Sequence, residues 1–173
     1  MLTPALAQSL VVLGITPEML QSRGLQPCPE AESLVLADTG ADGRAFMLQP
    51  EAAAAWQAMK QAAAADGVVM VLVSAFRSVG RQEEIMRAKL AGGQTIVEAL
   101  RLIAPPGYSE HHSGRAVDIG TPEDPELDED FEITPAFAWL QVHAAAHGFR
   151  MSYPRSNASG FAYEPWHWCF QPA

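Results

Sequence analysis

Residues 68–76 read VVMVLVSAF, an almost unbroken apolar run that is rich in β-branched side chains. A run this short indicates a strand rather than a helix, and its lack of alternation predicts a central strand covered on at least one face. The polar sequence RSVGRQEEI follows directly and predicts a turn into a helix over roughly 79–91. The chain is therefore expected to fold around this strand, with polar side chains gathered where the strand ends.

Shorter signals outline the remaining elements. Thr-Pro pairs at 3–4 and 16–17 combine an N-cap with a favourable first helical residue, and predict helices over roughly 4–13 and 17–23. Other helices are expected from Pro50 to Gly67, after Thr95, and from Pro135 to Gly148, and strands at 34–37, 45–48, 115–120 and from about 166. Because strands and helices are segregated, the sequence favours an α+β fold with a mainly antiparallel sheet flanked by helices.

Length and charge narrow the possible functions. The 173 residues predict a single domain, with a helical N-terminal extension over 1–32 and the main body over 33–171. The net charge of −9 argues against nucleic acid or an anionic membrane as partner. No apolar run approaches the roughly 20 residues of a membrane span. The N-terminus has no basic stretch and no clear cleavage site, so no export signal is predicted, and on this ground the cytoplasm is expected.

Two further features have a simple interpretation. Cys28 and Cys169 are too few for a disulfide scaffold, and two free thiols are expected, although an oxidising compartment would allow them to pair. The acidic segment 121–135, whose charges concentrate in 123–132, predicts a solvated loop. Its spacing does not match the calcium loop of an EF-hand.

Three potential metal ligands occur where loops meet predicted strands. His111 precedes Asp118 by seven residues, and His167 lies at the start of the last predicted strand. Two imidazoles and one carboxylate suit a catalytic zinc ion, which takes three protein ligands and leaves the fourth position to water. The alternative is that these histidines are hydrogen-bonded structural residues, and spacing alone favours that alternative.

A carboxylate and a guanidinium accompany this set. Glu164 lies three residues before His167, and in a flat strand the two side chains would point to opposite faces unless Pro165 imposes a turn. With such a turn, Glu164 could act as a general base. Arg77, at the end of the first strand, carries a planar fork that suits either a carboxylate ligand or a buried ion pair.

Three segments together resemble one enzyme family. SEHHSGRAVDI matches the SxHxxGxAxD signature of the VanY/VanX zinc D-alanyl-D-alanine peptidases (LAS metallopeptidases), and SAFRSVGRQ and EPWHW resemble their Arg-Ser and Glu-x-x-His elements. The resemblance covers roughly 33–171 and implies the Hedgehog/DD-peptidase fold, with that segment as the catalytic core. It implies these roles: His111, Asp118 and His167 as zinc ligands, Glu164 as catalytic base, Arg77 and Ser109 as the grip on the substrate carboxylate, and Gln82 as a residue lining the cleft.

The resemblance implies a D-alanyl-D-alanine carboxypeptidase with one zinc ion per chain, which removes the C-terminal D-alanine from peptidoglycan stem peptides or muropeptides. L,D-carboxypeptidase or D,D-dipeptidase activity is an alternative with the same chemistry. A non-enzymatic zinc-binding module like the Hedgehog signalling domain is an alternative of another class, and Arg77 with Ser109 argues against it. Such a substrate implies the periplasm or cell wall, in contrast to the absence of a predicted export signal. The sequence predicts no oligomeric state.

Residues near these motifs have more than one interpretation. In an extended loop, the ring of His112 would point away from that of His111. Gly114 is expected where the backbone passes close to the site. His143 and His147 have the i, i+4 spacing of a zinc-binding helix but no glutamate between them, and a surface role is favoured. Three aromatic residues are expected either to line the cleft or to join the core: Tyr108, Tyr153 and Trp166.

Overall fold

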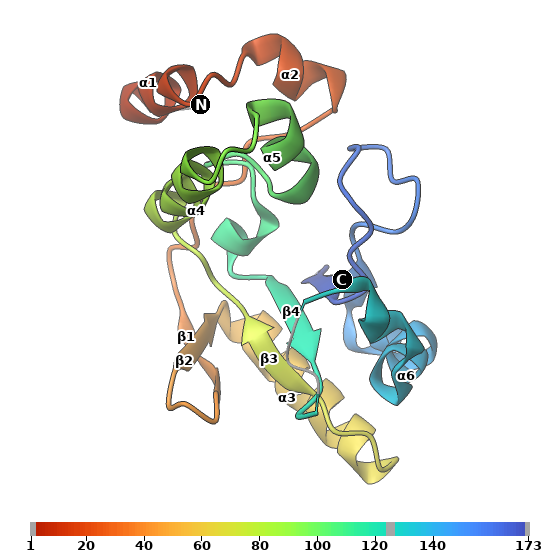
Figure 1. Ribbon diagram of the computed structural model, residues 1–173. Coiled ribbons are helices and arrows are strands. Elements are labelled where there is room, and N and C mark those ends of the chain that lie inside the picture. Colours follow the sequence, from red (N-terminus) through yellow and green to blue (C-terminus); the bar gives the residue numbers. More distant parts are fainter. Residues whose placement is uncertain (1–2, 124–126, 172–173) are drawn as a thin grey trace.

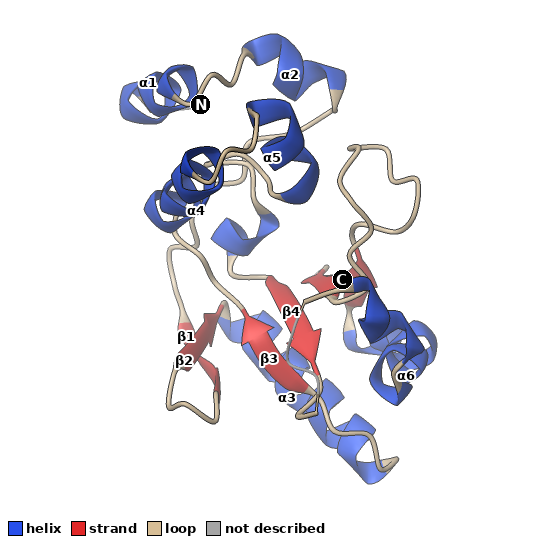
Figure 2. Cartoon of the chain, viewed as in Figure 1, coloured by secondary structure: helices blue, strands red, loops and turns tan. Residues whose placement is uncertain are grey.

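The computed structural model describes residues 3–123 and 127–171 of the chain. Its larger sheet has the strand order β3-β4-β6-β5, and every neighbouring pair is antiparallel. A separate hairpin pairs β1 with β2. The strands span Val35–Thr39 (β1), Ala45–Leu48 (β2), Val71–Ser74 (β3), Ala116–Gly120 (β4), Phe149–Met151 (β5) and His167–Phe170 (β6). The predicted α+β architecture is confirmed (Figures 1 and 2).

The apolar run 68–76 forms β3, but this strand lies at one end of the sheet order and not at its centre, contrary to the prediction. The β1–β2 hairpin covers its outer side: the Phe76 N–H donates to the Met47 carbonyl at 3.0 Å, and the Arg44 guanidinium donates to the Val73 carbonyl at 3.1 Å. The inner strand β4 is buried along its whole length. Met70 and Leu72 are buried while Val69 is 58% exposed, so the run is covered on one face, as expected, but is not buried as a whole.

Two helices pack with the sheets around the main core. These are α3 (Pro50–Ala65) and α6 (Pro135–His143). Small side chains such as Ala52 and Ala63 let α3 approach closely, while Trp56 fills the space between them and is fully buried. The Trp56 indole N–H also donates to Asp38 Oδ2 at 3.1 Å, which links α3 to β1. The lower part of the molecule in Figure 1 is thus the scaffold that supports the larger sheet.

Four helices gather at the other end of the molecule (Figure 1). They are α1 (Pro4–Val12), α2 (Pro17–Ser22), α4 (Val79–Ala91) and α5 (Ile96–Leu102). A second core joins Leu10 and Leu20 of the N-terminal extension to Met86 of α4 and Leu100 of α5. Tyr108 belongs to this core, which settles it as a core residue rather than part of a cleft wall. The extension therefore packs onto the helices that follow β3.

The helix starts that were predicted from capping residues are confirmed. Thr3 and Thr16 cap α1 and α2 through their hydroxyls, and Thr95 with Glu98 forms the predicted capping box of α5. By contrast, the segment from Pro135 is α-helical only to His143 and continues as a 3₁₀ turn over Ala144–His147. The loop before β4 is not extended, because Glu110–Ser113 form another 3₁₀ turn.

Other predictions concern loops and termini. Part of the acidic segment, residues 124–126, lies outside the described residues, and Glu129–Ile133 form a 3₁₀ turn. The two cysteines are free, as expected. Within residues 3–123 and 127–171, no helix combines the length and the apolar character that crossing a membrane requires.

Candidate active site

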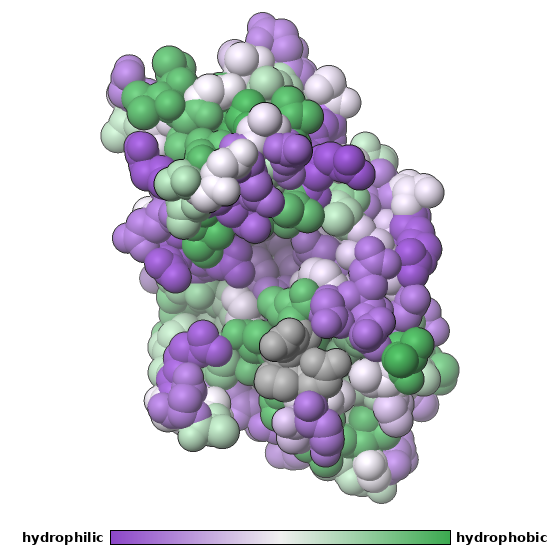
Figure 3. Space-filling model, viewed as in Figure 1, coloured by the Kyte–Doolittle hydropathy of each residue, from purple (hydrophilic) through white to green (hydrophobic). Residues whose placement is uncertain are grey.

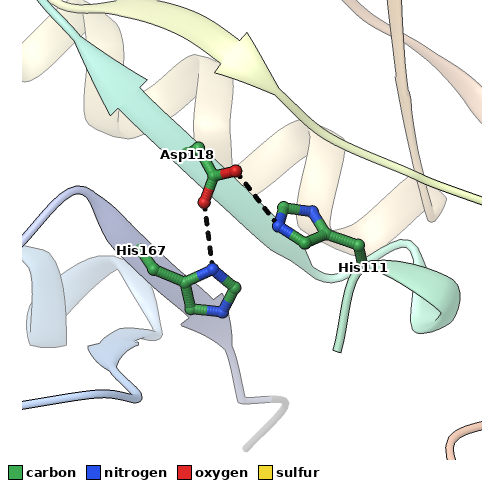
Figure 4. A group of neighbouring side chains, drawn as sticks. All are labelled: His111, Asp118 and His167. Carbon is green, nitrogen blue, oxygen red and sulfur yellow. Dashed lines mark hydrogen bonds and ion pairs between the residues drawn. The ribbon is translucent and has the colours of Figure 1, made fainter. Parts of the chain in front are cut away.

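Three buried side chains meet where β4 and β6 lie side by side. Asp118 of β4 is the direct cross-strand partner of His167 of β6, and His111 reaches them from the 3₁₀ turn before β4. His111 Nε2 lies 3.2 Å from Asp118 Oδ2, and His167 Nδ1 lies 3.0 Å from Asp118 Oδ1 (Figure 4). One ligand atom from each residue lies within 4.8 Å of the others, so the three side chains that the sequence singled out form a compact potential metal site.

Hydrogen bonds fix which nitrogen of His111 faces this group. Its Nδ1 lies 2.6 Å from the carbonyl oxygen of Ala75. Because a carbonyl can only accept, Nδ1 carries the hydrogen, and Nε2 presents its lone pair to the site. Burial also lowers the pKa of His111, against the attraction of Asp118, which favours the neutral ring that a metal requires.

His112 has a different role from its neighbour. Its Nδ1 donates to the Arg77 carbonyl at 2.6 Å, and its Nε2 accepts from the Gly107 N–H at 3.1 Å. The expectation that His112 points away from His111 was made for an extended loop, and the 3₁₀ turn that is present also gives the two rings different partners. His112 therefore fastens the loop to the chain that carries Arg77.

Asp118 and His167 stabilise each other's charged forms. Burial would raise the pKa of Asp118, but the two imidazoles outweigh it and hold that pKa well below the usual range. Burial would likewise lower the pKa of His167, but its hydrogen bonds to Asp118 and Glu110 raise it well above the ordinary value. In the chain without a cation, His167 thus carries the positive charge that the carboxylates require.

Glu164 reaches the same point through a turn. The backbone N–H of His167 donates to the backbone carbonyl of Glu164 at 3.1 Å, so the turn predicted from Pro165 is present. Glu164 Oε2 lies 3.8 Å from His167 Nδ1. Burial raises the pKa of Glu164 to about 7, although His167 acts in the opposite direction. A carboxylate with this pKa can both accept and return a proton near neutral pH.

Arg77 leaves the end of β3 and is held by polar neighbours. Its Nη1 donates to Gln82 Oε1 at 2.9 Å, its Nη2 donates to Ser74 Oγ at 3.0 Å, and Nη2 lies 3.8 Å from Asp118 Oδ2. Gln82 is fully buried, and its Nε2 donates to the Ala104 carbonyl at 2.6 Å. The amide of Gln82 therefore fixes the direction in which the guanidinium points.

These residues line one cavity of about 360 Å³. The lining includes Arg77, Gln82, Ser109, Glu164 and the three potential ligands, and the helical end adds Lys89 of α4 and Leu102, the last residue of α5. Figure 3 shows the surface hollowed between the helical end and the sheet end of the molecule. The cavity thus offers a potential metal site, a largely buried carboxylate and a largely buried guanidinium to one bound molecule.

The profile of a known family, described as "VanY: D-alanyl-D-alanine carboxypeptidase", matches residues 45–173. The chain belongs to the VanY family. It is 37% identical over 125 residues to the putative carboxypeptidase YodJ of Bacillus subtilis (strain 168), a match that covers 69% of this chain and 45% of that protein. The chain therefore spans about half the length of this curated VanY-type relative.

Solved structures give the same fold. The LdcB LD-carboxypeptidase, described as revealing the basis of peptidoglycan recognition, superposes with a TM-score of 0.74 at 32% identity and covers 82% of this chain and 69% of its own. A mutant of the vancomycin-resistance D,D-pentapeptidase VanY in complex with Zn(II) has a TM-score of 0.66 at 28% identity, covering 84% and 83%. The fold predicted from the VanY/VanX resemblance is therefore confirmed.

Sequence reasoning missed two residues of this VanY-family site. Glu110, next to His111, places Oε2 2.9 Å from His167 Nε2. Its place beside His111 was a sequence signal, but its reach to His167 depends on the 3₁₀ turn over Glu110–Ser113, which the sequence did not predict. Arg23, from the N-terminal extension, had no sequence signal, since its partners lie 77 and 136 residues away.

Arg23 connects the two walls of the cavity. Its guanidinium donates to the carbonyls of Leu100 in α5 and Ser159 in the loop before β6, each at 2.6 Å, and lies 4.2 Å from the centre of the Phe161 ring. The ring centre of Phe161 lies 4.8 Å from that of Tyr153, and the ring centre of Tyr153 lies 4.7 Å from that of His167. Tyr153 and Trp166 line the cavity, as one of their two interpretations expected.

Gly114 and the pair His143 and His147 lie outside the cavity. Gly114 has a φ of +66°, and a Cβ there would lie 2.9 Å from Leu34 Cδ2, so the close approach is to the chain before β1 and not to the cavity. His143 and His147 stack on Trp139 with ring centres 4.6 and 6.1 Å away. Within the described residues no third ligand joins these two histidines, which agrees with the favoured surface role.

Proposed function

We propose that this protein is a zinc-dependent carboxypeptidase that removes the C-terminal D-alanine from peptidoglycan stem peptides. The observation that carries the proposal is the convergence of a His-Asp-His group, Glu164 and Arg77 on one cavity. A purely structural metal site has no use for a buried base of near-neutral pKa, or for a guanidinium beside it, so both favour an enzyme over a binding module.

The donor set fits zinc. Two imidazole nitrogens and one carboxylate oxygen are ligands that zinc prefers, and three protein ligands are typical of catalytic sites. His111, Asp118 and His167 would hold one ion per chain, and the VanY structure in complex with Zn(II) supports the choice of metal. When bound, zinc supplies a Lewis acid that polarises the scissile carbonyl and makes water a better nucleophile at neutral pH.

The remaining residues handle protons and orientation. Glu164 takes the proton of the attacking water and passes it to the leaving amine, for which a pKa of about 7 is well matched. Arg77 and Ser109 bind the terminal carboxylate, and the planar fork of Arg77 suits its two oxygens. Gln82 lines the same cavity and keeps the fork in place through Arg77 Nη1. Arg77 also lies close enough to Asp118 to stabilise charge on the reacting carbonyl.

L,D-carboxypeptidase activity on tetrapeptide stems is the second candidate. It is supported by the likeness to the LdcB LD-carboxypeptidase, whose TM-score exceeds that of the zinc-bound VanY structure. Both activities use the same residues and differ in the configuration of the residue before the scissile bond. The substrate places the reaction in the periplasm or cell wall, or in the cytoplasm if released muropeptides are trimmed there.

The test is a mass-spectrometric digest of three substrates by the purified protein, with and without a chelator. The panel contains a pentapeptide stem ending in D-Ala-D-Ala, a tetrapeptide stem ending in a single D-Ala, and the free D-Ala-D-Ala dipeptide. We expect chelator-sensitive loss of one D-alanine from the pentapeptide. Preference for the tetrapeptide would select the L,D activity, and preference for the dipeptide would select a D,D-dipeptidase. Absence of cleavage in all three would contradict a peptidase of this kind.

A further inference from the structure

We propose that Glu110 is a positioning residue that holds the hydrogen of His167 on Nε2 and thereby presents Nδ1 to the metal. The inference rests on the proposed zinc site, but it assigns a function to a half-buried carboxylate that the catalytic scheme does not use. It also explains why the loop that supplies His111 places an acidic residue directly beside that ligand.

The geometry around His167 is two-sided. Nδ1 lies 3.0 Å from Asp118 Oδ1, within the ligand group, and the second ring nitrogen points away from Asp118 (Figure 4). That nitrogen, Nε2, lies 2.9 Å from Glu110 Oε2. An ionised carboxylate can only accept a hydrogen bond, so the hydrogen in this contact belongs to Nε2. In a neutral ring, Nδ1 is then the nitrogen with the free lone pair.

Glu110 is itself held in place. The Ser152 hydroxyl, just after β5, donates to Glu110 Oε2 at 2.5 Å. The side chain of His167 is only 3% exposed and that of Glu110 is 33% exposed, so water competes weakly at the ring and more strongly at the outer edge of the carboxylate. Ser152, Glu110 and His167 thus form a chain of hydrogen bonds that ends at Nε2, on the ring whose Nδ1 is the potential ligand atom.

This arrangement matches a general requirement of histidine ligands. The ring nitrogen that does not bind the metal usually donates to a carboxylate or carbonyl, which fixes the ring orientation and increases the basicity of the ligand. His111 meets the requirement through the Ala75 carbonyl, and His167 meets it through Glu110. One acceptor is neutral and the other is charged, so the stronger support falls on His167.

The test measures zinc affinity rather than activity. Zinc dissociation constants would be obtained by competition with a chromophoric chelator for the unaltered protein, Glu110→Ala, Glu110→Gln and Ser152→Ala. We expect about 10- to 100-fold weaker binding for Glu110→Ala, since loss of such partners has this effect. Glu110→Gln should fall between, because its amide oxygen still accepts but is uncharged. Glu132→Gln, which alters a half-buried glutamate that is paired with Arg155 outside the cavity, is the matched control and should bind zinc normally.

A spectroscopic measurement separates positioning from folding. In the zinc-loaded protein, NMR should show a His167 Nε2–H proton that is shifted downfield and exchanges slowly with water. This signal should be lost in Glu110→Ala and retained in Ser152→Ala. Circular dichroism of each metal-free variant identifies any that fail to fold. If Glu110→Ala does not fold, the positioning role is tested on Glu110→Gln alone, because that substitution preserves the side-chain volume.

The outcomes distinguish this inference from the proposed function. Tight zinc binding that weakens in the Glu110 variants supports the positioning role even if no stem peptide is cleaved. Unchanged zinc affinity and an unchanged Nε2–H signal in Glu110→Ala would overturn it, even if the protein cleaves every stem peptide. Failure of the unaltered protein to bind zinc would overturn both.

Discussion

Glu164 is the residue at which stability and activity should separate. Burial raises its pKa from an ordinary 4.5 to about 7, against the opposing effect of His167. A carboxyl group whose pKa is raised by folding destabilises the fold when ionised, so the penalty is absent below about pH 4.5 and complete above about pH 7. At about 1.4 kcal/mol per pKa unit, the ionised group costs the metal-free protein roughly 3 kcal/mol.

Glu164→Gln retains the shape of the side chain and removes its ionisation. For the metal-free protein at about pH 9, we expect the free energy of unfolding to rise by about 2–3 kcal/mol, and to change little at about pH 4.5. The same substitution should lower kcat/KM of the zinc-loaded enzyme by about 100- to 10,000-fold, the usual effect of losing a general base. Urea unfolding at both pH values and D-alanine release measure the two effects.

The control is Glu132→Gln, in which the altered carboxylate is 35% exposed and lies in an ion pair with Arg155. It should leave activity unchanged and should not reproduce the gain in stability at high pH. The reasoning is refuted if Glu164→Gln changes stability equally at both pH values, or if the variant retains full activity. The first result would show that burial does not penalise the carboxylate, and the second that Glu164 is not the base.

Three further predictions concern the same cavity. The acid limb of the kcat/KM profile should have its midpoint at or below about pH 7, because activity is lost as Glu164 is protonated and a bound cation lowers the pKa of Glu164. A pH–rate profile with a midpoint clearly above 7 would contradict this. In steady-state kinetics, Arg77→Lys should lower kcat/KM by about 10- to 100-fold and Gln82→Met by about 10-fold. Each substitution removes a hydrogen bond that involves a charged group. Equal activity of both variants and the unaltered enzyme would contradict the proposed binding of the substrate carboxylate. Arg23→Met should raise KM by about 10-fold with unchanged zinc affinity, since two charged hydrogen bonds that join the cavity walls are lost, and an unchanged KM would remove the extension from the site.

The ligand group could be predicted because each of its members has a local signal. His111, Asp118 and His167 lie in short motifs at the junctions of loops and strands, and antiparallel pairing then brings Asp118 and His167 opposite one another. Glu164 could also be predicted from the sequence, because the fixed φ of Pro165 predicts the turn that joins Glu164 to His167. Their catalytic roles remain predictions that the experiments above address.

Features that depend on distant contacts could not be predicted. The edge position of β3 depends on the β1–β2 hairpin, whose docking leaves no periodic signal in residues 68–76. Strand β5 was missed because only three residues pair there, after a helix that ends in a 3₁₀ turn. Arg23 was missed because its partners are set by how the N-terminal extension packs on α5, which composition and spacing do not encode.

The most direct test of the central claim is a zinc titration of the metal-free protein, followed by release of D-alanine from a pentapeptide stem. We expect no release before zinc is added and a rise that ends at one zinc per chain. Asp118→Asn should be inactive at the same zinc concentration, because that variant lacks the carboxylate between His111 and His167. Full release from the chelated protein, or an Asp118→Asn variant as active as the unaltered chain, would contradict the central claim.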